Sequence, residues 1–454
     1  MAVQTVAPAA VNRNAFLARY QRNRERSRVI FDLVADRAYY DRPIALRHPI
    51  VFYEGHLPAF SFNTLVKRAL GRPSIDPQLE TLFARGIDPH ETDAATANAS
   101  LPSWPDRSTV AQFAAEADRQ VLDALTNAEL DRPGHPLLDR ADAVFSILEH
   151  EAMHQETLLY MWHRLPFDRK RAPSGYAPIV SDEGPAAEWI EIPDGRATLG
   201  VDRAAVPFAW DNECPAASAF VDAFAIERHD VTNGRYLEFV EAGGYEDERW
   251  WDPLAWQWLR AEGIRHPLFW ERESEWRWRG MFASIPLPLA WPVYVSQVEA
   301  SAFARWRGVR LPTEAEFQRA AFGTPEGDER KHPWGDADPA PVHGVFDFAS
   351  WDPQPVGRHS AGRSAWGVDD LVGNGWEWTS TTFAPFAGFR AMASYPEYSA
   401  DFFDGEHVVM KGASPATASE LLRPTFRNWF RTRYPYVYAT FRCAADIGTA
   451  RERL

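Results

Sequence analysis

The chain has 454 residues, a length that exceeds one ordinary hydrophobic core and predicts two or three domains. Its net charge of −15 disfavours nucleic acid as a partner, because phosphate binding needs a basic surface. The chain has no run of about 18 apolar residues and its N-terminus lacks a signal-peptide pattern. We therefore expect a cytoplasmic protein without a membrane partner. The 2 cysteines argue against a disulfide framework or a thiolate metal cluster.

Residues 1–165 show mainly helical periodicity and are predicted to form one domain. Four helices are expected, over Asn14–Ala35, Pro49–Leu70, Ser108–Ala128 and Pro136–Arg164. Ser108 is the expected N-cap of the third helix, and an irregular connection is expected from Ile87 to Asp106. Four long helices with polar joints predict a bundle, in which facing side chains commonly build metal sites in the core.

The fourth predicted helix carries the motif His150-Glu-Ala-Met-His154. At about 100° per residue, the two histidines lie roughly 40° apart and one turn from each other, so both imidazoles can face one metal ion. Apolar residues share their face of the helix. Glu151 and Glu156 point elsewhere, so a third ligand must come from another part of the chain. An isolated pair of this kind also occurs by chance in many helices.

Residues 166–187 are rich in proline and charge and are interpreted as a linker. In residues 188–454, short β-like runs alternate with turns rich in Gly, Pro, Asn and Asp. Two short helices are predicted, Thr232–Ala242 and Ser296–Arg307, each capped by its first residue. The tryptophan-rich stretch 250–278 carries little regular pattern, and long loops of this kind commonly serve function or pack through their own side chains.

Several motifs of the second domain resemble the formylglycine-generating-enzyme/sulfatase-modifying-factor domain, which has a C-type-lectin-like fold. The resemblance extends over about residues 188–446, with the motifs in the same order. It is carried by Glu227-Arg-His-Asp-Val-Thr-Asn-Gly-Arg-Tyr, Pro292-Val-Tyr-Val-Ser, Arg310-Leu-Pro-Thr-Glu-Ala-Glu-Phe, Pro333-Trp-Gly-Asp, Asp370-Leu-Val-Gly-Asn-Gly-Trp-Glu-Trp-Thr and Ala439-Thr-Phe-Arg-Cys-Ala. The first domain resembles the DinB-like bundle. The fold class is therefore expected to be α+β, a DinB-like four-helix bundle followed by a lectin-like α+β domain.

This pairing of domains resembles the ergothioneine and ovothiol sulfoxide synthases (EgtB and OvoA). The resemblance implies a non-haem iron, Fe(II), held by His150, His154 and one early histidine. His56, in Arg47-His-Pro-Ile-Val-Phe-Tyr-Glu-Gly-His, matches that position, whereas His48 precedes a proline that favours extended backbone. The implied substrates are small molecules: O2, hercynine and a sulfur or selenium donor. Imidazole ligands suit Fe(II), and a three-residue site leaves coordination positions open.

The chain also departs from that family. Met153 stands where many members have a glutamine that contacts the substrate imidazole. Phe383 and Phe386 occupy the positions expected for a proton-donating tyrosine. In the segment expected to bind the substrate carboxylate, Asn428 and Trp429 are kept, and Phe430 stands where some members have aspartate. These departures favour the selenoneine synthase (SenA) branch, which joins hercynine to a selenosugar. A selenolate is a strong nucleophile, so its reaction is expected to need no tyrosine as proton donor.

Three other functions compete with this one. The nearest is an EgtB-type synthase that uses cysteine or γ-glutamylcysteine. A DinB-like thiol transferase or hydrolase that uses zinc or nickel is a second, and a lectin-like binding protein with a structural metal is a third. Formylglycine generation is disfavoured because only Cys443 lies where that enzyme has a copper-binding cysteine pair. Trp429 and Phe386 are candidates for an aromatic cage around the trimethylammonium group of hercynine.

Overall fold

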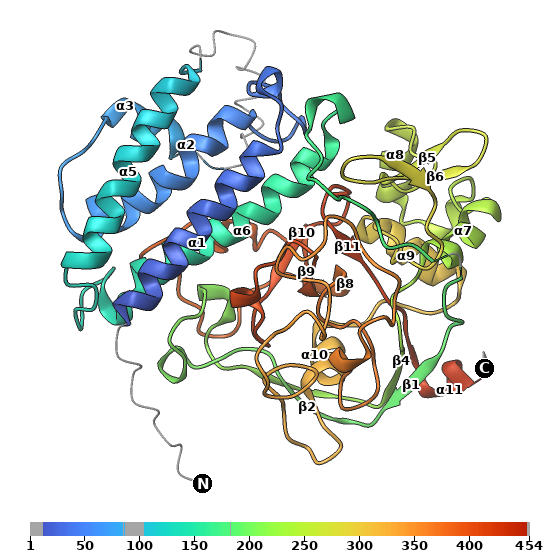
Figure 1. The fold of residues 1–454 in the computed structure, drawn as a ribbon. Coiled ribbons are helices and arrows are strands. Elements are labelled where there is room, and N and C mark those ends of the chain that lie inside the picture. Colours follow the sequence, from blue (N-terminus) through green and yellow to red (C-terminus); the bar gives the residue numbers. More distant parts are fainter. Residues whose placement is uncertain (1–11, 85, 87–103, 182, 452–454) are drawn as a thin grey trace. The chain divides into compact units, whose positions relative to one another are not determined.

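The computed structural model describes residues 12–84, 86, 104–181 and 183–451 (Figure 1). Residues 87–103 of the predicted irregular connection lie outside this range. The chain forms two compact units. The first comprises the described residues up to Tyr176 together with the segment Ala393–Tyr395, and the second comprises Ala177–Met392 and the residues from Pro396 onward. Within the described ranges, no helix combines the length and the apolar character that crossing a membrane requires.

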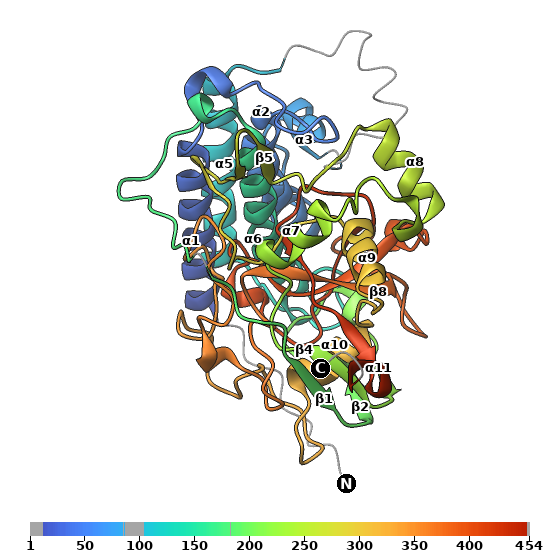
Figure 2. The ribbon, with the colours of Figure 1, turned by 90° about the vertical axis from the view of Figure 1, so that its right-hand side faces the viewer.

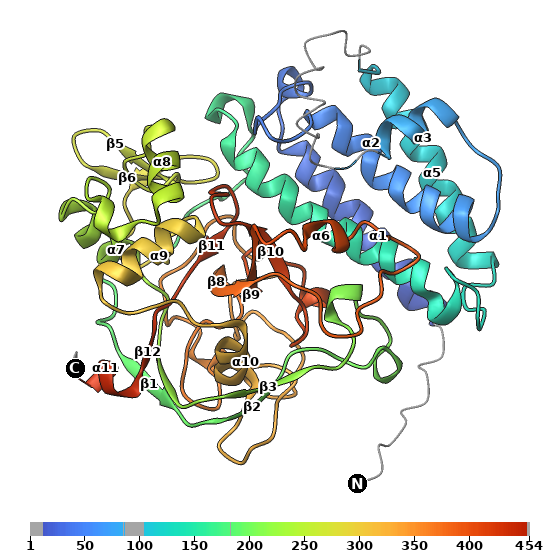
Figure 3. The same ribbon diagram turned by 180° about the vertical axis from the view of Figure 1, so that it is seen from behind.

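Long helices build the first unit (Figures 1 and 3). They pack around one hydrophobic core. Phe16, Phe62, Val121 and Ile147 are among the buried side chains of this core. A π-helical segment directly continues α2, so α2 and this segment form one rod. The helices are α1 (Arg13–Asp32), α2 (Ile50–Ser61) with its π-helical continuation (Phe62–Ala69), α3 (Pro77–Phe83), α5 (Arg107–Asn127) and α6 (Asp142–Arg164).

Two helix starts differ from the sequence prediction. The N-cap of α5 is Asp106, whose carboxylate accepts a hydrogen bond from the Thr109 amide at 2.9 Å, so Ser108 lies inside the first turn. Helix α6 begins at Asp142, later than predicted, because Arg140 and Ala141 adopt left-handed backbone with φ of 57° and 58°. Helix α3 was not predicted from the sequence.

Small sheets and short helices make up the second unit. The central sheet has the strand order β10-β9-β8-β11, in which only the pair β8 and β11 is parallel. Its strands are β8 (Gly375–Thr382), β9 (His407–Ala413), β10 (Asn428–Arg431) and β11 (Ala439–Thr440). A second sheet has the order β1-β4-β12, with β1 (Trp189–Ile192), β4 (Phe224–Glu227) and β12 (Ala444–Asp446). Helix α11 (Ile447–Arg451) lies beside it (Figure 2). Strands β2 (Gly195–Thr198) and β3 (Ser218–Val221) form an antiparallel pair.

The predicted caps of the two short helices are confirmed. Thr232 caps α7 (Asn233–Glu241), and Ser296 with Glu299 forms a capping box on α9 (Gln297–Trp306). The prediction for the tryptophan-rich stretch was wrong, because much of it is regular. It contains α8 (Pro253–Ala261) and the strands β5 (Trp270–Arg272) and β6 (Trp276–Arg279), which pair with β7 (Ser284–Pro286). Helix α10 (Glu314–Phe322) completes the unit.

A buried arginine connects the central sheet with the β1-β4-β12 sheet of the second unit. Arg442 is fully buried and its guanidinium forms hydrogen bonds to both carboxylate oxygens of Glu377, at 2.6 and 2.8 Å. It also donates to Asp230 at 3.1 Å and to the main-chain carbonyls of Glu227, Arg228 and Asp369. Glu377 is the central residue of the Trp-Glu-Trp motif on β8. Its carboxylate is therefore committed to a structural ion pair.

Candidate metal centre

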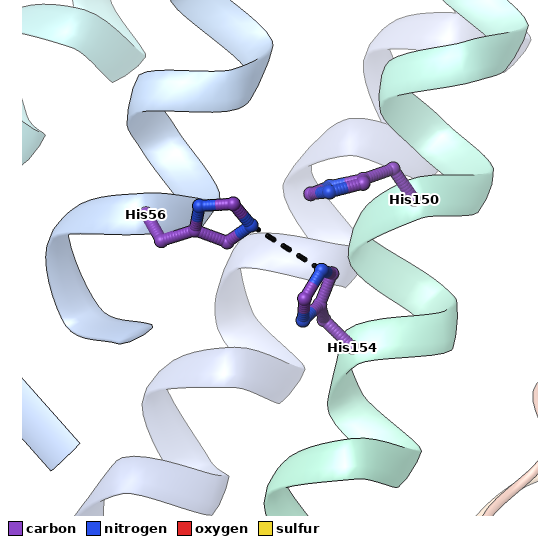
Figure 4. Close-up of side chains that lie close together, drawn as sticks. All are labelled: His56, His150 and His154. Atoms are coloured by element: carbon purple, nitrogen blue, oxygen red, sulfur yellow. Dashed lines mark hydrogen bonds between the residues drawn. The ribbon is translucent and has the colours of Figure 1, made fainter. Parts of the chain in front are cut away.

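Three histidines converge inside the first unit. His56 comes from α2, and His150 and His154 come from α6 (Figure 4). All three are buried, and one potential ligand atom from each lies within 4.8 Å of the others. The Nε2 atoms of His56 and His154 are 3.3 Å apart. Two nitrogens that each lie about 2.1 Å from one ion, roughly 100° apart, would be about 3.2 Å from each other. The geometry therefore suits one shared ion.

The hydrogen bonding of the three rings also fits a metal. Among the residues that the structure describes, neither ring nitrogen of His150 has a hydrogen-bond partner, and neither does Nδ1 of His154. A buried polar atom without a partner costs about 1–3 kcal/mol, and such atoms are rare in native proteins. A bound ion would supply the missing interaction for the nitrogens that face it. The donor set, three neutral imidazoles, suits Fe(II), zinc and other transition metals.

A main-chain carbonyl orients the His56 ring. Its Nδ1 donates a hydrogen bond to the Phe83 carbonyl oxygen at 2.7 Å, which leaves Nε2 as the nitrogen that faces the other two histidines. Metal-binding histidines commonly donate their second N–H in this way, which fixes tautomer and ring orientation. Phe83 is the last residue of α3. The start of that helix is held by Glu80, whose carboxylate accepts from the amides of Ile75 and Asp76.

We predict that Gly55→Ala weakens the metal site through Phe83. A Cβ at Gly55 would lie 2.4 Å from the Phe83 ring, which is itself fully buried, so the ring and its carbonyl must move. Alanine adds about 1 kcal/mol of helix propensity, whereas overpacking costs about 1–3 kcal/mol. We expect a net loss of stability and an approximately 10–100-fold loss of metal affinity, as for other lost partners of ligating histidines. Calorimetry and metal titration measure both.

Gly448→Ala in α11 is the matched control, because a Cβ there meets nothing within 4 Å. It should leave metal affinity unchanged. Equal metal affinity in Gly55→Ala and wild type would contradict the role assigned to Phe83.

Two aromatic rings lie against His150. Phe60 stacks on its imidazole, with ring centroids 3.5 Å apart and planes 6° from parallel. Tyr395 lies edge-on to the same imidazole at 5.9 Å, and 5.2 Å from the Phe60 ring. Tyr395 belongs to the first unit, although in sequence it follows β8. The sequence motif places the family's tyrosine near Phe383 and Phe386 and gives no indication of Tyr395. The sequence Ser394-Tyr-Pro-Glu-Tyr398 in the same loop was the available signal.

The other residues considered from the first unit lie outside this group. The Nε2 of His48 bonds to the Gly86 carbonyl at 3.0 Å. The Glu151 carboxylate accepts from Arg24 at 2.9 Å and from Ser27 at 2.7 Å, so it faces α1, as its angle on the helix indicated. Met153 is half-buried and directly precedes His154 on α6. Its role in substrate binding stays a prediction.

In the second unit, two of the predicted substrate-binding aromatics, Phe383 and Phe386, lie against Arg427, and a third, Trp429, lies against Phe383. Phe383 stacks on Trp429 at 4.3 Å with planes 5° from parallel. The Arg427 guanidinium lies 5.0 Å from the ring centre of Phe383 and 4.5 Å from that of Phe386. Arg427 is itself paired with Glu314, with an Nε–Oε1 distance of 2.8 Å. One face of Phe386 is thus already occupied by a cation.

The remaining two predicted residues lie on the opposite face of β10. Side chains alternate along a strand, so Asn428 and Phe430 point away from the side that Trp429 takes. Phe430 stacks on Tyr434 at 4.9 Å, and the Asn428 side-chain oxygen accepts from the Trp429 amide at 2.9 Å. The structure therefore does not bring Asn428, Trp429 and Phe430 into one cluster.

Burial keeps the three imidazoles neutral. Desolvation lowers the pKa of His56 to about 4, against a smaller opposite effect of its bond to Phe83. Desolvation is also the main reason why the pKa values of His150 and His154 lie well below the usual value. Repulsion from a protonated neighbouring imidazole lowers them further. Metal binding requires neutral imidazoles, so the site is in the correct protonation state near pH 7.

We predict that the metal-free protein loses stability in mild acid. The unfolded histidines take up protons as the pH falls through about 6.5, whereas the folded ones do not until a much lower pH. The free energy of unfolding should therefore be level above about pH 6.5 and fall from there towards pH 4, with on the order of 3 kcal/mol from His56 alone. Denaturant titrations of metal-free protein at several pH values test this. The triple variant His56→Phe/His150→Phe/His154→Phe should show a smaller slope.

Comparisons with known proteins agree with the two-domain fold. Residues 19–158 match the DinB superfamily, and residues 177–447 match the sulfatase-modifying factor enzyme 1-like domain. A hercynine oxygenase of Mycolicibacterium thermoresistibile is 35% identical over 452 residues, which cover 96% of each chain. That of Mycolicibacterium smegmatis is 33% identical over 83% of this chain and 86% of its own. Ergothioneine biosynthesis protein 1 of Schizosaccharomyces pombe is 28% identical over 87% of this chain and 51% of its own.

The chain belongs to the hercynine oxygenase family. It is accordingly an oxidoreductase, and the predicted α+β fold class, with a DinB-like bundle followed by a formylglycine-generating-enzyme-like domain, is confirmed. The buried three-histidine site lies within the residues that match the DinB superfamily.

Proposed function

We propose that this member of the hercynine oxygenase family is an Fe(II)- and O2-dependent synthase that joins a chalcogen to the imidazole ring of hercynine. The observation that carries the proposal is the convergence of His56, His150 and His154 in a chain whose relatives are named hercynine oxygenases. Fe(II) held by three imidazoles retains open positions, and there it would supply the activation of O2. Zinc cannot supply that chemistry because it has no redox states.

The protein's own residues have three tasks in this proposal. The buried histidines hold the ion as neutral ligands, with His56 oriented by Phe83. Phe60 and Tyr395 cover one side of His150 with aromatic surface, which limits the access of water at that side. The phenol of Tyr395 acts as the proton donor, in place of the family tyrosine whose expected positions are occupied here by Phe383 and Phe386.

We further propose that the donor is a selenosugar and not a thiol. Met153 supports this, because it replaces the glutamine that contacts the imidazole in many sulfoxide synthases. The replacement of the family's proton-donating tyrosine by Phe383 and Phe386 no longer supports selenium, because another tyrosine, Tyr395, lies beside His150. The names of the relatives favour the alternative, in which cysteine or γ-glutamylcysteine is the donor and a C–S bond forms.

In this proposal, Trp429 of the second unit binds the trimethylammonium group of hercynine. Roles in substrate binding for Asn428, Phe383, Phe386, Phe430 and Met153 stay predictions. A trimethylammonium group cannot donate hydrogen bonds, and it is best held over an aromatic face. Both rings are half-buried and each has one face covered, but Trp429 stacks on the uncharged Phe383, whereas Phe386 already faces the Arg427 cation, which would repel a second cation. Trp429 is therefore the stronger of the two predicted cage residues.

The function is tested with anaerobically purified protein reloaded with Fe(II). Hercynine, O2 and either a selenosugar or γ-glutamylcysteine are added, and products are identified by mass spectrometry. A C–Se product that requires both Fe(II) and O2 supports the full proposal. A C–S product without a C–Se product overturns the selenium assignment and keeps the synthase. Turnover of a thiol substrate with zinc and without O2 overturns both in favour of a thiol transferase.

A further inference from the structure

The segment Ala393–Tyr395 is held by side chains of two helices of the first unit. Ser394 is fully buried. Its hydroxyl donates to the Asp142 carboxylate at 2.8 Å and lies 2.8 Å from the Ser146 hydroxyl, both on the first turns of α6. Arg68 donates one hydrogen bond to the Ser394 carbonyl at 3.2 Å and another to the Ala393 carbonyl at 3.0 Å. We call Arg68, Asp142, Ser146 and Ser394 the Ser394 clamp.

The clamp acts on the residue that follows it. Tyr395 is the next residue after Ser394, and its ring lies edge-on to His150 and against Phe60. With both the hydroxyl and the carbonyl of Ser394 fixed, the Cα of Tyr395 has little freedom, and the position of its ring depends only on its own side-chain torsions. His150 and Ser146 are one turn apart on α6, so the clamp and the metal site share one helix face.

The π-helical segment explains how Arg68 reaches this place. Phe60 on α2 contacts the Tyr395 ring, and Arg68, eight residues later, contacts the backbone of the same segment. In a regular α-helix, positions eight apart are about 80° apart around the axis. The wider turns of the π-helix (Phe62–Ala69) rotate each residue less, which brings Arg68 closer to the side that Phe60 faces. Departures of this kind inside helices are frequent at functional sites.

We propose that Arg68, Asp142 and Ser146 are positioning residues of the enzyme. Through Ser394 they hold Tyr395 beside His150, and they thereby set the rate of the reaction at the metal without being metal ligands themselves. The rate prediction rests on the proposed function, because it needs turnover. The structural part of the inference does not rest on it.

The activity test uses Ser394→Ala and Arg68→Met, each alone and in a Tyr395→Phe background. We expect each single variant to lower kcat about 10-fold, with the iron content and the KM for hercynine unchanged. In the Tyr395→Phe background the same substitutions should lower kcat no further, because the clamp acts only through this tyrosine. Arg68→Lys should restore part of the rate. Arg72→Met is the matched control, since Arg72 pairs with Asp123 outside the clamp.

An equal loss of kcat in both backgrounds would show a general structural role and overturn the proposal, and so would unchanged kcat in the single variants. If Arg68→Met fails to fold, Ser146→Ala replaces it, because that variant keeps the bond between Ser394 and Asp142.

A second measurement needs no turnover and separates the clamp from the proposed function. Protein loaded with Fe(II) is mixed with an excess of a chromophoric chelator, and the rate of iron loss is followed. Loosening Tyr395 uncovers one side of His150, so Ser394→Ala and Arg68→Met should lose iron several-fold faster than wild type and Arg72→Met. Unchanged rates would overturn the clamp. Faster loss in a protein that does not turn over hercynine would support the clamp and reject the proposed function.

Discussion

His150→Ala is expected to abolish the metal centre. The variant keeps only two of the three converging ligands. Loss of a residue that only hydrogen-bonds to a ligating histidine already lowers metal affinity or activity about 10–100-fold, so loss of a ligand should cost more. We expect substoichiometric iron and a loss of activity of more than about 100-fold. Wild type should gain thermal stability when Fe(II) is added, because the ion binds only the folded protein, and His150→Ala should not. Metal analysis and anaerobic calorimetry measure these effects.

His48→Ala is the matched control for this variant. His48 is also a buried histidine of the same unit, but its Nε2 bonds to the Gly86 carbonyl and it is not part of the metal group. It should take up iron normally. A stoichiometric iron content in His150→Ala would refute the assignment of the ligand. An unfolded bundle in His150→Ala, together with no reaction in wild type, would instead favour a metal with a purely structural role.

Arg442→Met is expected to have the largest effect on stability. It would leave the carboxylates of Glu377 and Asp230 fully buried without their cation, and breaking a buried pair from one side typically costs about 3–5 kcal/mol. The pKa of Asp230 is already held well above its usual value by burial. For a unit of this size, the loss corresponds to a fall of roughly 10 °C in the unfolding temperature. Calorimetry of the metal-free protein measures it.

Two further variants test the origin of that loss. Arg442→Met/Glu377→Gln should be more stable than Arg442→Met, because it removes one of the uncompensated charges. Arg310→Met breaks a partly exposed pair with Glu316 and should cost less than about 1 kcal/mol. A similar unfolding temperature for Arg442→Met and Arg310→Met would contradict the structural role of the buried cluster.

The sequence by itself determined the two local features of the metal site. A helical period and two histidines four residues apart place both imidazoles on one helix face, because 3.6 residues complete a turn. The structure has that arrangement on α6. The caps Thr232 and Ser296 were predictable for the same reason, since capping depends on residues three positions apart. The motifs of the second domain, which depend on order along the chain, identified its fold class.

Contacts between distant segments were decided only by the tertiary structure. Angles on α6 showed that a third ligand was needed but not which one, and the choice of His56 came from a family motif. Its orientation depends on the Phe83 carbonyl, which no local pattern marks. Likewise, Tyr395 reaches His150 because Arg68, Asp142 and Ser146 hold Ser394, residues separated from it by 248 positions and more. Periodicity describes neighbours within one element, whereas such contacts arise when separate elements pack.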